Sequence, residues 1–177
     1  LGTPSILKTR RFGYDGKGQV KLEATSNPNQ IWKSLGKKEL ILEGFVDFSH
    51  EISVIGSRSK DGQISCFDPG ENVHKDGILR TTTVPANLTT QQKTDAVLIT
   101  AKILESLNYI GVIGVEFFVA NSTLIINEFA PRVHNSGHWT QNGCTVDQFE
   151  QHIRAITGLS LGNAERHCDV IMENLIG

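Results

Sequence analysis

The segment 127–140 combines a carboxylate, a guanidinium and two imidazoles, and it shows little hydrophobic periodicity. Its sequence is NEFAPRVHNSGHWT. The apolar run 124–126 leads directly into it, so a buried strand would deliver these polar groups to one place. Pro131 ends that strand because proline has no N–H to give to a β-ladder. The segment therefore predicts a functional site, and a polar loop with ordinary surface histidines is the alternative.

Two glutamates, Glu116 and Glu128, interrupt strands that are otherwise apolar. If residues 121–123 form the hairpin loop, the two carboxylates lie opposite each other on one sheet face, whereas a two-residue loop would put them on opposite faces. Like charges directly across a ladder repel, so the pair needs a cation or a shared proton. Mg²⁺ beside a nucleotide is the expected partner. The alternative is one exposed glutamate and one salt bridge.

A glycine-rich segment, 12–18, joins two expected strands and contains Lys17. Its backbone N–H groups and lysine could hold a polyphosphate, and Lys8 on the preceding strand could reach the same anion. The glycine spacing fits neither the dinucleotide fingerprint nor the Walker pattern. An ordinary turn between two strands is the alternative interpretation.

Glu43 and Glu51 flank a short segment that contains Phe45 and Val46. A functional interpretation is a nucleotide hinge, in which backbone groups near Phe45 and Val46 recognise adenine and a carboxylate accepts from ribose hydroxyls. Exposed glutamates on strands are common, however, and they are the simpler alternative.

His134 and His138 have the i, i+4 spacing of a helical zinc site. The residues between them are poor helix formers and no third ligand is obvious, so the pattern disfavours zinc. Cys144 is a conceivable thiol nucleophile activated by one of these histidines. A small buried cysteine is the more common role.

Composition indicates a globular protein of one domain, or of one domain with a small lobe, because the 177 residues are 38% hydrophobic and 20% charged. A net charge of −2 gives no electrostatic reason to expect nucleic acid or an anionic membrane as a partner. No apolar run approaches the length of a bilayer span. Three cysteines without metal-type spacing favour a reducing, cytoplasmic location. The chain starts without methionine, so we expect a piece of a longer protein.

The expected elements are rich in strands. Strands are predicted at 5–9, 20–24, 39–43, 50–59, 63–67, 78–84, 112–119 and 124–129. Helices are predicted from Asn27 to about residue 35, from a capping box at 89–92 to about residue 108, and after a second capping box at 145–148. In this last helix, Phe149, Ile153 and Ile156 are expected to face inward. Tight hairpins in this order predict an α+β fold rather than a doubly wound parallel sheet.

These motifs together resemble the ATP-grasp superfamily: a glycine-rich hairpin with lysines, a two-carboxylate hinge, and paired strand glutamates followed by Ala-Pro-Arg. More specifically, segments 14–19, 71–80, 127–140, 148–156 and 172–177 resemble the 5-(carboxyamino)imidazole ribonucleotide synthase family. The resemblance covers practically the whole chain. It implies an ATP-grasp fold of two lobes with mainly antiparallel sheets, the small lobe at 1–44 and the large lobe at 45–177. The N- and C-terminal domains that flank this region in the family are expected to be absent.

The resemblance also implies a reaction. ATP phosphorylates bicarbonate to carboxyphosphate, and the exocyclic amine of 5-aminoimidazole ribonucleotide is then carboxylated in purine biosynthesis. The expected cofactors are ATP and Mg²⁺, and the full-length protein is expected to be a homodimer. Without its flanking domains the fragment is expected to be inactive. A non-catalytic nucleotide-binding module and another ATP-grasp carboxylate ligase are the alternatives.

The resemblance assigns roles to individual residues. The nucleotide-binding set is Lys8, Tyr14, Asp15, Gly16, Lys17, Gly18, Glu43, Phe45, Val46 and Glu51. The catalytic set is Lys17, Arg132 and His134, and the metal ligands are Glu116 and Glu128. The substrate-binding set is His74, Arg80, Asn135, Ser136 and His138.

Overall fold

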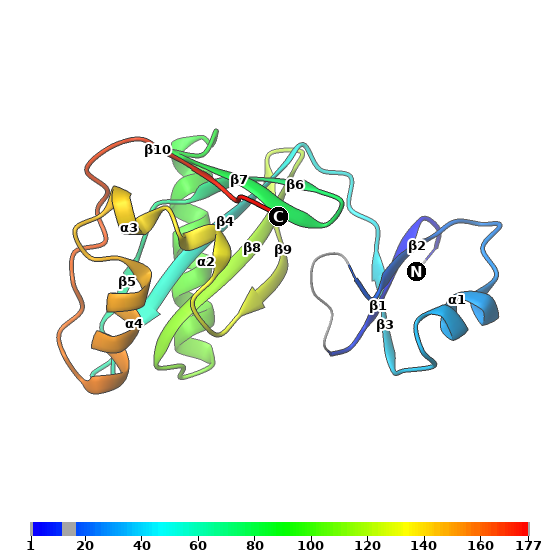
Figure 1. The fold of residues 1–177 in the computed structure, drawn as a ribbon, viewed down its shortest axis with the longest axis horizontal. Helices are drawn as coiled ribbons and strands as arrows, with labels where there is room; N and C mark the ends of the chain where they lie inside the picture. The colour runs from blue at the N-terminus through cyan, green and yellow to red at the C-terminus, as the bar shows by residue number, and fades with distance from the viewer. Residues whose placement is uncertain (1, 12–16, 177) are drawn as a thin grey trace. The chain divides into compact units, whose positions relative to one another are not determined.

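The computed structural model describes residues 2–11 and 17–176, and it forms two compact units (Figure 1). Unit 1 comprises residues 1–47 and 74–78, and unit 2 comprises residues 48–73 and 79–177. Tyr14, Asp15 and Gly16, three of the predicted nucleotide-binding residues, lie outside the described residues. None of the described helices is both long enough and apolar enough to span a bilayer.

Unit 1 contains a three-stranded antiparallel sheet in the order β2-β1-β3 and one helix. The elements are β1 (Ser5–Thr9), β2 (Gln19–Leu22), α1 (Pro28–Ser34) and β3 (Leu40–Gly44). Helix α1 begins where expected, because the Asn27 side chain accepts from two N–H groups of the first turn and a proline opens the helix.

Unit 2 is built on a seven-stranded sheet in the order β10-β7-β6-β4-β8-β9, with β5 paired to β4. Its strands are β4 (His50–Arg58), β5 (Ile64–Cys66), β6 (Gly70–Lys75), β7 (Ile78–Val84), β8 (Gly111–Ala120), β9 (Thr123–Ala130) and β10 (Val170–Glu173). Strands β6 and β10 are absent from the sequence prediction, since one is polar and the other has four residues. The remaining strands match the prediction to within a few residues.

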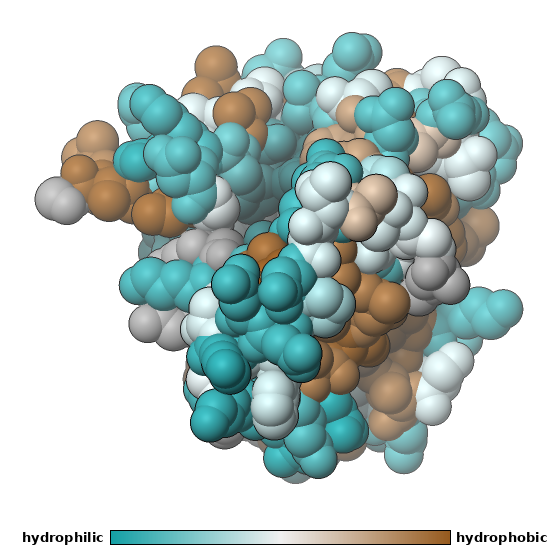
Figure 2. Space-filling model, turned by 90° about the vertical axis from the view of Figure 1, so that its right-hand side faces the viewer, coloured by the Kyte–Doolittle hydropathy of each residue, from teal (hydrophilic) through white to brown (hydrophobic). Residues whose placement is uncertain are grey.

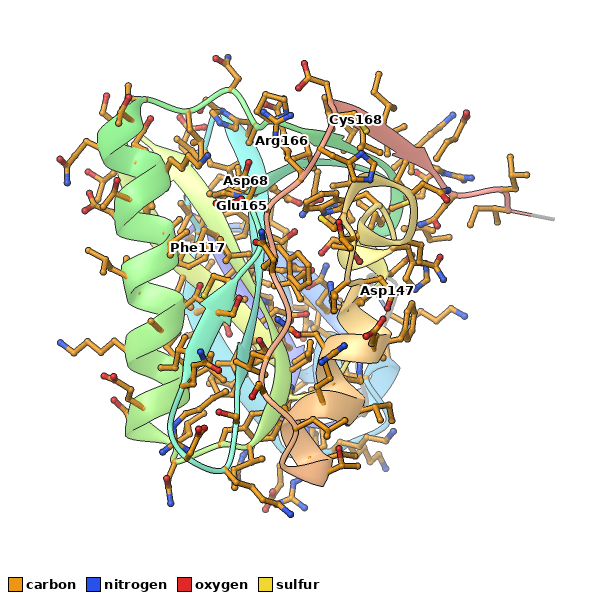
Figure 3. The ribbon with its side chains drawn as sticks, turned by 90° about the vertical axis from the view of Figure 1, so that its left-hand side faces the viewer. Asp68, Phe117, Asp147, Glu165, Arg166 and Cys168 are labelled. Atoms are coloured by element: carbon orange, nitrogen blue, oxygen red, sulfur yellow. The ribbon has the colours of Figure 1, made fainter. Side chains whose placement is uncertain are left out.

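Helices cover both faces of this sheet (Figure 3). Helix α2 (Thr90–Ser106), which begins at the expected capping box, packs on one face over a core that includes Ile52, Val115 and Phe117. The other face carries the 3₁₀ turn η1 (Asn135–Gly137), α3 (Thr140–Gly143) and α4 (Gln148–Thr157). A second apolar cluster, which includes Ile55 and Trp139, lies on that face. The polar segment 127–140 therefore begins at the end of β9 and continues over the sheet face opposite α2.

Helix α4 contradicts two predictions. Its N-cap is Asp147, whose carboxylate accepts from two N–H groups of the first turn, and the expected capping box at 145–148 does not form. The residues expected to face inward are exposed: Phe149 by 36%, Ile153 by 53% and Ile156 by 39%. The helix buries polar amides, so its apolar stripe faces outward.

Hydrogen bonds to backbone groups explain why α4 buries amides. The Gln151 side chain accepts from the N–H of Gly162 at 2.8 Å and donates to its carbonyl at 3.0 Å. Gln148, which is fully buried, makes an equivalent pair with the backbone of His134. A hydrophobic pattern alone does not reveal that a helix docks through amides.

Asp68 ties the segment after α4 to the rest of unit 2 (Figure 3). Its carboxylate accepts from Lys93 at 2.8 Å and from Arg166 at 2.9 Å, and Arg166 also pairs with Asp169. Burial alone would raise the pKa of Asp68, but the hydrogen bonds and charges of Lys93 and Arg166 outweigh it and hold the pKa below its ordinary value. The carboxylate therefore stays ionised, and its ion pairs stay formed, at any pH above its ordinary pKa.

Apolar side chains also reach the surface of both units. Figure 2 shows such residues gathered between hydrophilic ones on the face it displays. In unit 1 they include Trp32, Ile41, Leu42 and Phe45.

Candidate active site

Glu116 and Glu128 are directly paired across β8 and β9, although the turn between these strands differs from the prediction. The hairpin loop has two residues, Asn121 and Ser122, both with positive φ. Such a loop alone would separate the glutamates onto opposite faces. The ladder is irregular next to Phe117, so that one additional residue of β9 lies between the two registers. This β-bulge brings the glutamates back into direct opposition.

The two carboxylates lie on the sheet face that carries η1 and α4. Glu116 is paired with Ser53 on β4, and Glu51 precedes Ser53 by two positions on the same strand. Alternation along β4 and direct pairing with β8 and β9 therefore place Glu51, Glu116 and Glu128 on one face. In residues 2–11 and 17–176, no three His, Cys, Asp or Glu side chains form a complete metal site. Two carboxylates nevertheless suit Mg²⁺, which takes its other oxygens from water and phosphate.

His134 lies over β8 and contacts Glu116, with Nε2 at 3.4 Å from Oε1. Gly114, two positions before Glu116, makes room for it: a Cβ at Gly114 would lie 2.8 Å from the His134 Cβ. The side-chain amide of Gln148 accepts from the His134 N–H at 2.9 Å and donates to its carbonyl at 2.7 Å. The histidine is therefore held both by its backbone and by its ring.

His138 has a different environment from His134. It follows η1, is exposed, and its ring centroid lies 5.6 Å from that of Phe149. The two histidines thus flank a 3₁₀ turn rather than lie on an α-helix, and they face different partners. Arg132 is exposed, and its guanidinium donates to the Val133 carbonyl at 2.9 Å.

Unit 1 contains the remaining described nucleotide-binding candidates other than Glu51. Lys8 on β1 forms an ion pair with Glu43 on β3 at 2.8 Å. Lys17 is exposed, and Gly18 has a positive φ of 79°. Phe45 is 42% exposed, and its ring lies 4.5 Å from the Lys21 ammonium. Val46, next along the segment, is partly buried.

Arg80 and His74 lie on β7 and β6. The Arg80 Nε is buried and has no hydrogen-bond partner among the described residues. A buried N–H of a guanidinium without an acceptor is costly, so this atom is a candidate for contact with an anionic group.

Cys144 does not have the properties of a nucleophile. It is 6% exposed, and burial raises the pKa of its thiol to about 11. Burial likewise raises the pKa of Cys66 to about 12. These thiols behave as small buried residues, and all three cysteines of the chain are free.

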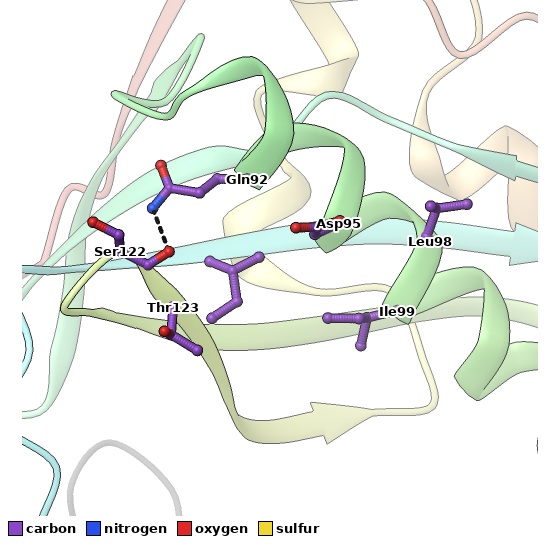
Figure 4. Close-up of a pocket in the computed structure, with 7 residues that line it drawn as sticks. Gln92, Asp95, Leu98, Ile99, Ser122 and Thr123 are labelled. Carbon is purple, nitrogen blue, oxygen red and sulfur yellow. Dashed lines mark hydrogen bonds between the residues drawn. The ribbon is translucent and has the colours of Figure 1, made fainter.

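A hollow of about 390 Å³ lies between α2 and the β8–β9 turn (Figure 4). Gln92 and Ser122 close one end through a hydrogen bond of 3.3 Å. It contains none of the predicted site residues and belongs to the α2 side of the sheet.

Gly114 and Gln148 contact His134 directly, and Ser53 contacts it through Ser136, yet none of the three is among the predicted site residues. Ser53 could have been identified as a small polar residue at a buried position of an apolar strand. Gly114 and Gln148 carry no comparable signal, because their importance depends on contacts between distant segments.

Comparison with protein families matches an ATP-grasp domain model to residues 1–149. The chain belongs to the ATP-grasp family. This ATP-grasp chain is 54% identical over its whole length to the N5-carboxyaminoimidazole ribonucleotide synthase of Brucella melitensis biotype 1 and covers 50% of that protein. The corresponding enzyme of Escherichia coli K12 is 44% identical over the whole chain, which covers 49% of it. The chain thus spans about half the length of these curated relatives.

Solved structures agree with this assignment. The synthetase from Thermus thermophilus superposes with a TM-score of 0.90 at 40% identity, over 99% of this chain and 47% of that one. The synthase from Aspergillus clavatus, solved with ADP and 5-aminoimidazole ribonucleotide, gives 0.88 at 30% identity, over 100% of this chain and 46% of that one. The predicted α+β ATP-grasp fold with mainly antiparallel sheets, and the predicted resemblance to this synthase family, are confirmed.

Proposed function

We propose that the intact protein containing this chain carboxylates 5-aminoimidazole ribonucleotide with bicarbonate and ATP, through carboxyphosphate. The products are 5-(carboxyamino)imidazole ribonucleotide, ADP and phosphate, in purine biosynthesis. The observation that carries the proposal is the 54% identity to a synthase of this name across the entire chain. The structural relative solved with ADP and 5-aminoimidazole ribonucleotide supports the same pair of ligands.

The nucleotide would be held mainly by residues of unit 1. The ammonium groups of Lys8 and Lys17 neutralise the phosphates, and the backbone N–H groups of segment 14–18 donate to them. The base is recognised by Glu43, Phe45 and Val46. Glu51 accepts from the ribose hydroxyls. For this, Lys8 would leave or share its ion pair with Glu43, so nucleotide binding replaces one charge pair with another.

Glu116 and Glu128 would hold Mg²⁺, because their direct pairing across the ladder needs a compensating cation. When bound, Mg²⁺ would neutralise the charge that develops on the transferring phosphoryl oxygens. The rest of catalysis is positioning, since two anions must be brought together.

The carboxyphosphate and ribonucleotide would contact the polar segment and two neighbouring strands. Arg132 and His134 line the carboxyphosphate side, and Lys17 lies close to bicarbonate. The binding residues for the ribonucleotide are His74, Arg80, Asn135, Ser136 and His138. The unpaired Nε–H of Arg80 supports an anionic group at this place.

The intact protein is further proposed to be a cytoplasmic homodimer. The free cysteines support a reducing compartment, and the family resemblance supports the dimer.

The test is ATP hydrolysis by the intact protein with Mg²⁺, bicarbonate and 5-aminoimidazole ribonucleotide. ADP release should require both co-substrates, and the carbamate should be trapped as product. Hydrolysis that depends on another carboxylate would identify a different ligase. Nucleotide binding without turnover, unaffected by Glu116→Gln, would identify a binding module.

A further inference from the structure

The geometry assigns Ser53 as a positioning residue that orients the Glu116 carboxylate through Ser136 and His134. This inference rests on the proposed function, in which Glu116 is a metal ligand. It adds a residue outside the family-derived site.

Four side chains form a continuous path of polar contacts. The Ser53 hydroxyl donates to the Ser136 hydroxyl at 2.7 Å, and Ser136 Oγ lies 2.8 Å from His134 Nδ1. On the other side of the ring, His134 Nε2 lies 3.4 Å from Glu116 Oε1. Because Ser53 and Glu116 are directly paired across β4 and β8, the path starts and ends at the same point of the sheet.

The contacts hold the imidazole ring of His134 from both sides. Ser136 Oγ contacts Nδ1 and the Glu116 carboxylate contacts Nε2, so these two groups set the orientation of the ring. Ser136 is in turn held by the Ser53 hydroxyl, so loss of that hydroxyl leaves Ser136, and with it the ring, less constrained.

Both serine hydroxyls of this path are shielded from solvent. Ser53 is 2% exposed and Ser136 is 1% exposed, so water has little access to substitute for a missing hydroxyl. The backbone of His134 is held separately by Gln148, so the serines determine the orientation of the ring rather than the position of the chain.

The orientation of the Glu116 carboxylate affects how tightly the site binds its cation. Contact of Oε1 with His134 restricts rotation of the Glu116 carboxylate, which lies directly opposite Glu128 in the ladder. Outer partners that orient a metal ligand typically change metal affinity by about 10- to 100-fold. Loss of the Ser53 hydroxyl should therefore weaken the metal site while leaving the fold intact.

The experiment compares Ser53→Ala with Ser57→Ala in the intact natural protein. Ser57 is a matched control because it lies on the same strand, is fully buried, and donates to the Ser65 carbonyl away from the path. Mn²⁺ serves as the metal probe, followed by its paramagnetic resonance signal in the presence of ADP. The environment of the His134 ring is read from its ¹⁵N resonances in two-dimensional ¹H–¹⁵N spectra of histidine-labelled protein, with His134→Gln used for assignment.

Ser53→Ala should raise the Mn²⁺ dissociation constant about 10-fold or more and shift the ¹⁵N resonances of the His134 ring, because the contact of Nδ1 with Ser136 changes. Ser57→Ala should change neither, and Ser53→Thr should restore both because it keeps the hydroxyl. If Ser53→Ala does not fold, Ser136→Ala interrupts the same path. Unchanged His134 ring resonances with unchanged Mn²⁺ affinity overturn the proposal, as does an equal effect of Ser57→Ala.

The ¹⁵N readout requires no turnover, so it separates this inference from the proposed function. An intact protein that fails to carboxylate 5-aminoimidazole ribonucleotide, yet shows the shift of the His134 ring resonances in Ser53→Ala, would refute the proposed reaction and retain the path.

Discussion

Gly114→Ala tests whether the room over β8 is needed for His134. Residue 114 lies within the extended strand β8 and lacks a positive φ, so alanine is allowed by the backbone. The added Cβ would lie 2.8 Å from the His134 Cβ and 2.9 Å from its Cγ. Ordinary contact begins at 3.4 Å, so the histidine must move by at least 0.6 Å.

That displacement competes with three fixed distances. The His134 ring is 2.8 Å from Ser136 Oγ, and its backbone is held by Gln148 at 2.9 and 2.7 Å. Moving by about 0.6 Å would stretch such bonds beyond their normal range. Overpacking costs about 1–3 kcal/mol, while alanine in a strand gains roughly 0.5–1 kcal/mol over glycine. We expect a net loss of about 1–2 kcal/mol in the free energy of unfolding.

The turnover number should fall by about 10-fold or more, because the displaced ring no longer orients Glu116. The loss of unfolding free energy alone would not cause a fall of this size. Urea denaturation and steady-state ADP release measure the two effects. Gly56→Ala is the control: its Cβ would lie 2.7 Å from Thr100 on the α2 side, so it should lose similar stability but keep turnover. Normal turnover in Gly114→Ala, or equal loss in Gly56→Ala, would refute the reasoning.

Three further outcomes are expected. Asp68→Asn should lower the free energy of unfolding by about 1–3 kcal/mol at pH 7, because charged hydrogen bonds are lost. The pKa of Asp68 is lowered in the folded protein, so its contribution to the free energy of unfolding is fully present above the unfolded pKa of about 3.9. That contribution disappears as the pH falls through the pKa of the folded protein. Denaturation curves of Asp68→Asn and of the unchanged protein should therefore converge at acidic pH. At pH 8, iodoacetamide should label exposed Cys168 well before Cys144, because the Cys144 pKa of about 11 leaves about one thiol in a thousand as thiolate. Peptide mass spectrometry measures the order of labelling. The reverse order would show that Cys144 is not buried. Without metal, Glu128→Gln should keep or raise the midpoint of thermal unfolding, since it relieves the repulsion between the Glu116 and Glu128 carboxylates. With metal, it should lower turnover about 100-fold or more. Near-normal turnover would contradict the metal assignment.

The sequence predicted the chemistry of the β8–β9 hairpin better than its geometry. The pairing of Glu116 with Glu128 was expected from a three-residue loop, and the structure reaches it through a two-residue loop and a bulge. A bulge changes which residues oppose each other without leaving a mark in the hydrophobic pattern. Side-chain type indicated that the glutamates belong together, while the register depended on the folded sheet.

Helix α4 shows the opposite case. Periodicity alone predicted that Phe149 and Ile153 would be buried, but Gln148 and Gln151 occupy the inner face because backbone groups there need partners. Those partners come from segments distant in the chain, so no local pattern could identify them. Strand β6 was missed for a related reason, since its polar residues pair inside a large sheet.

The Gln148 amide gives the protein an internal reporter. The His134 N–H donates to this side chain rather than to a neighbouring strand or helical turn, so its protection from solvent deuterium depends on α4 staying docked. Exchange of that single amide proton would thus measure how often the helix lifts from the sheet.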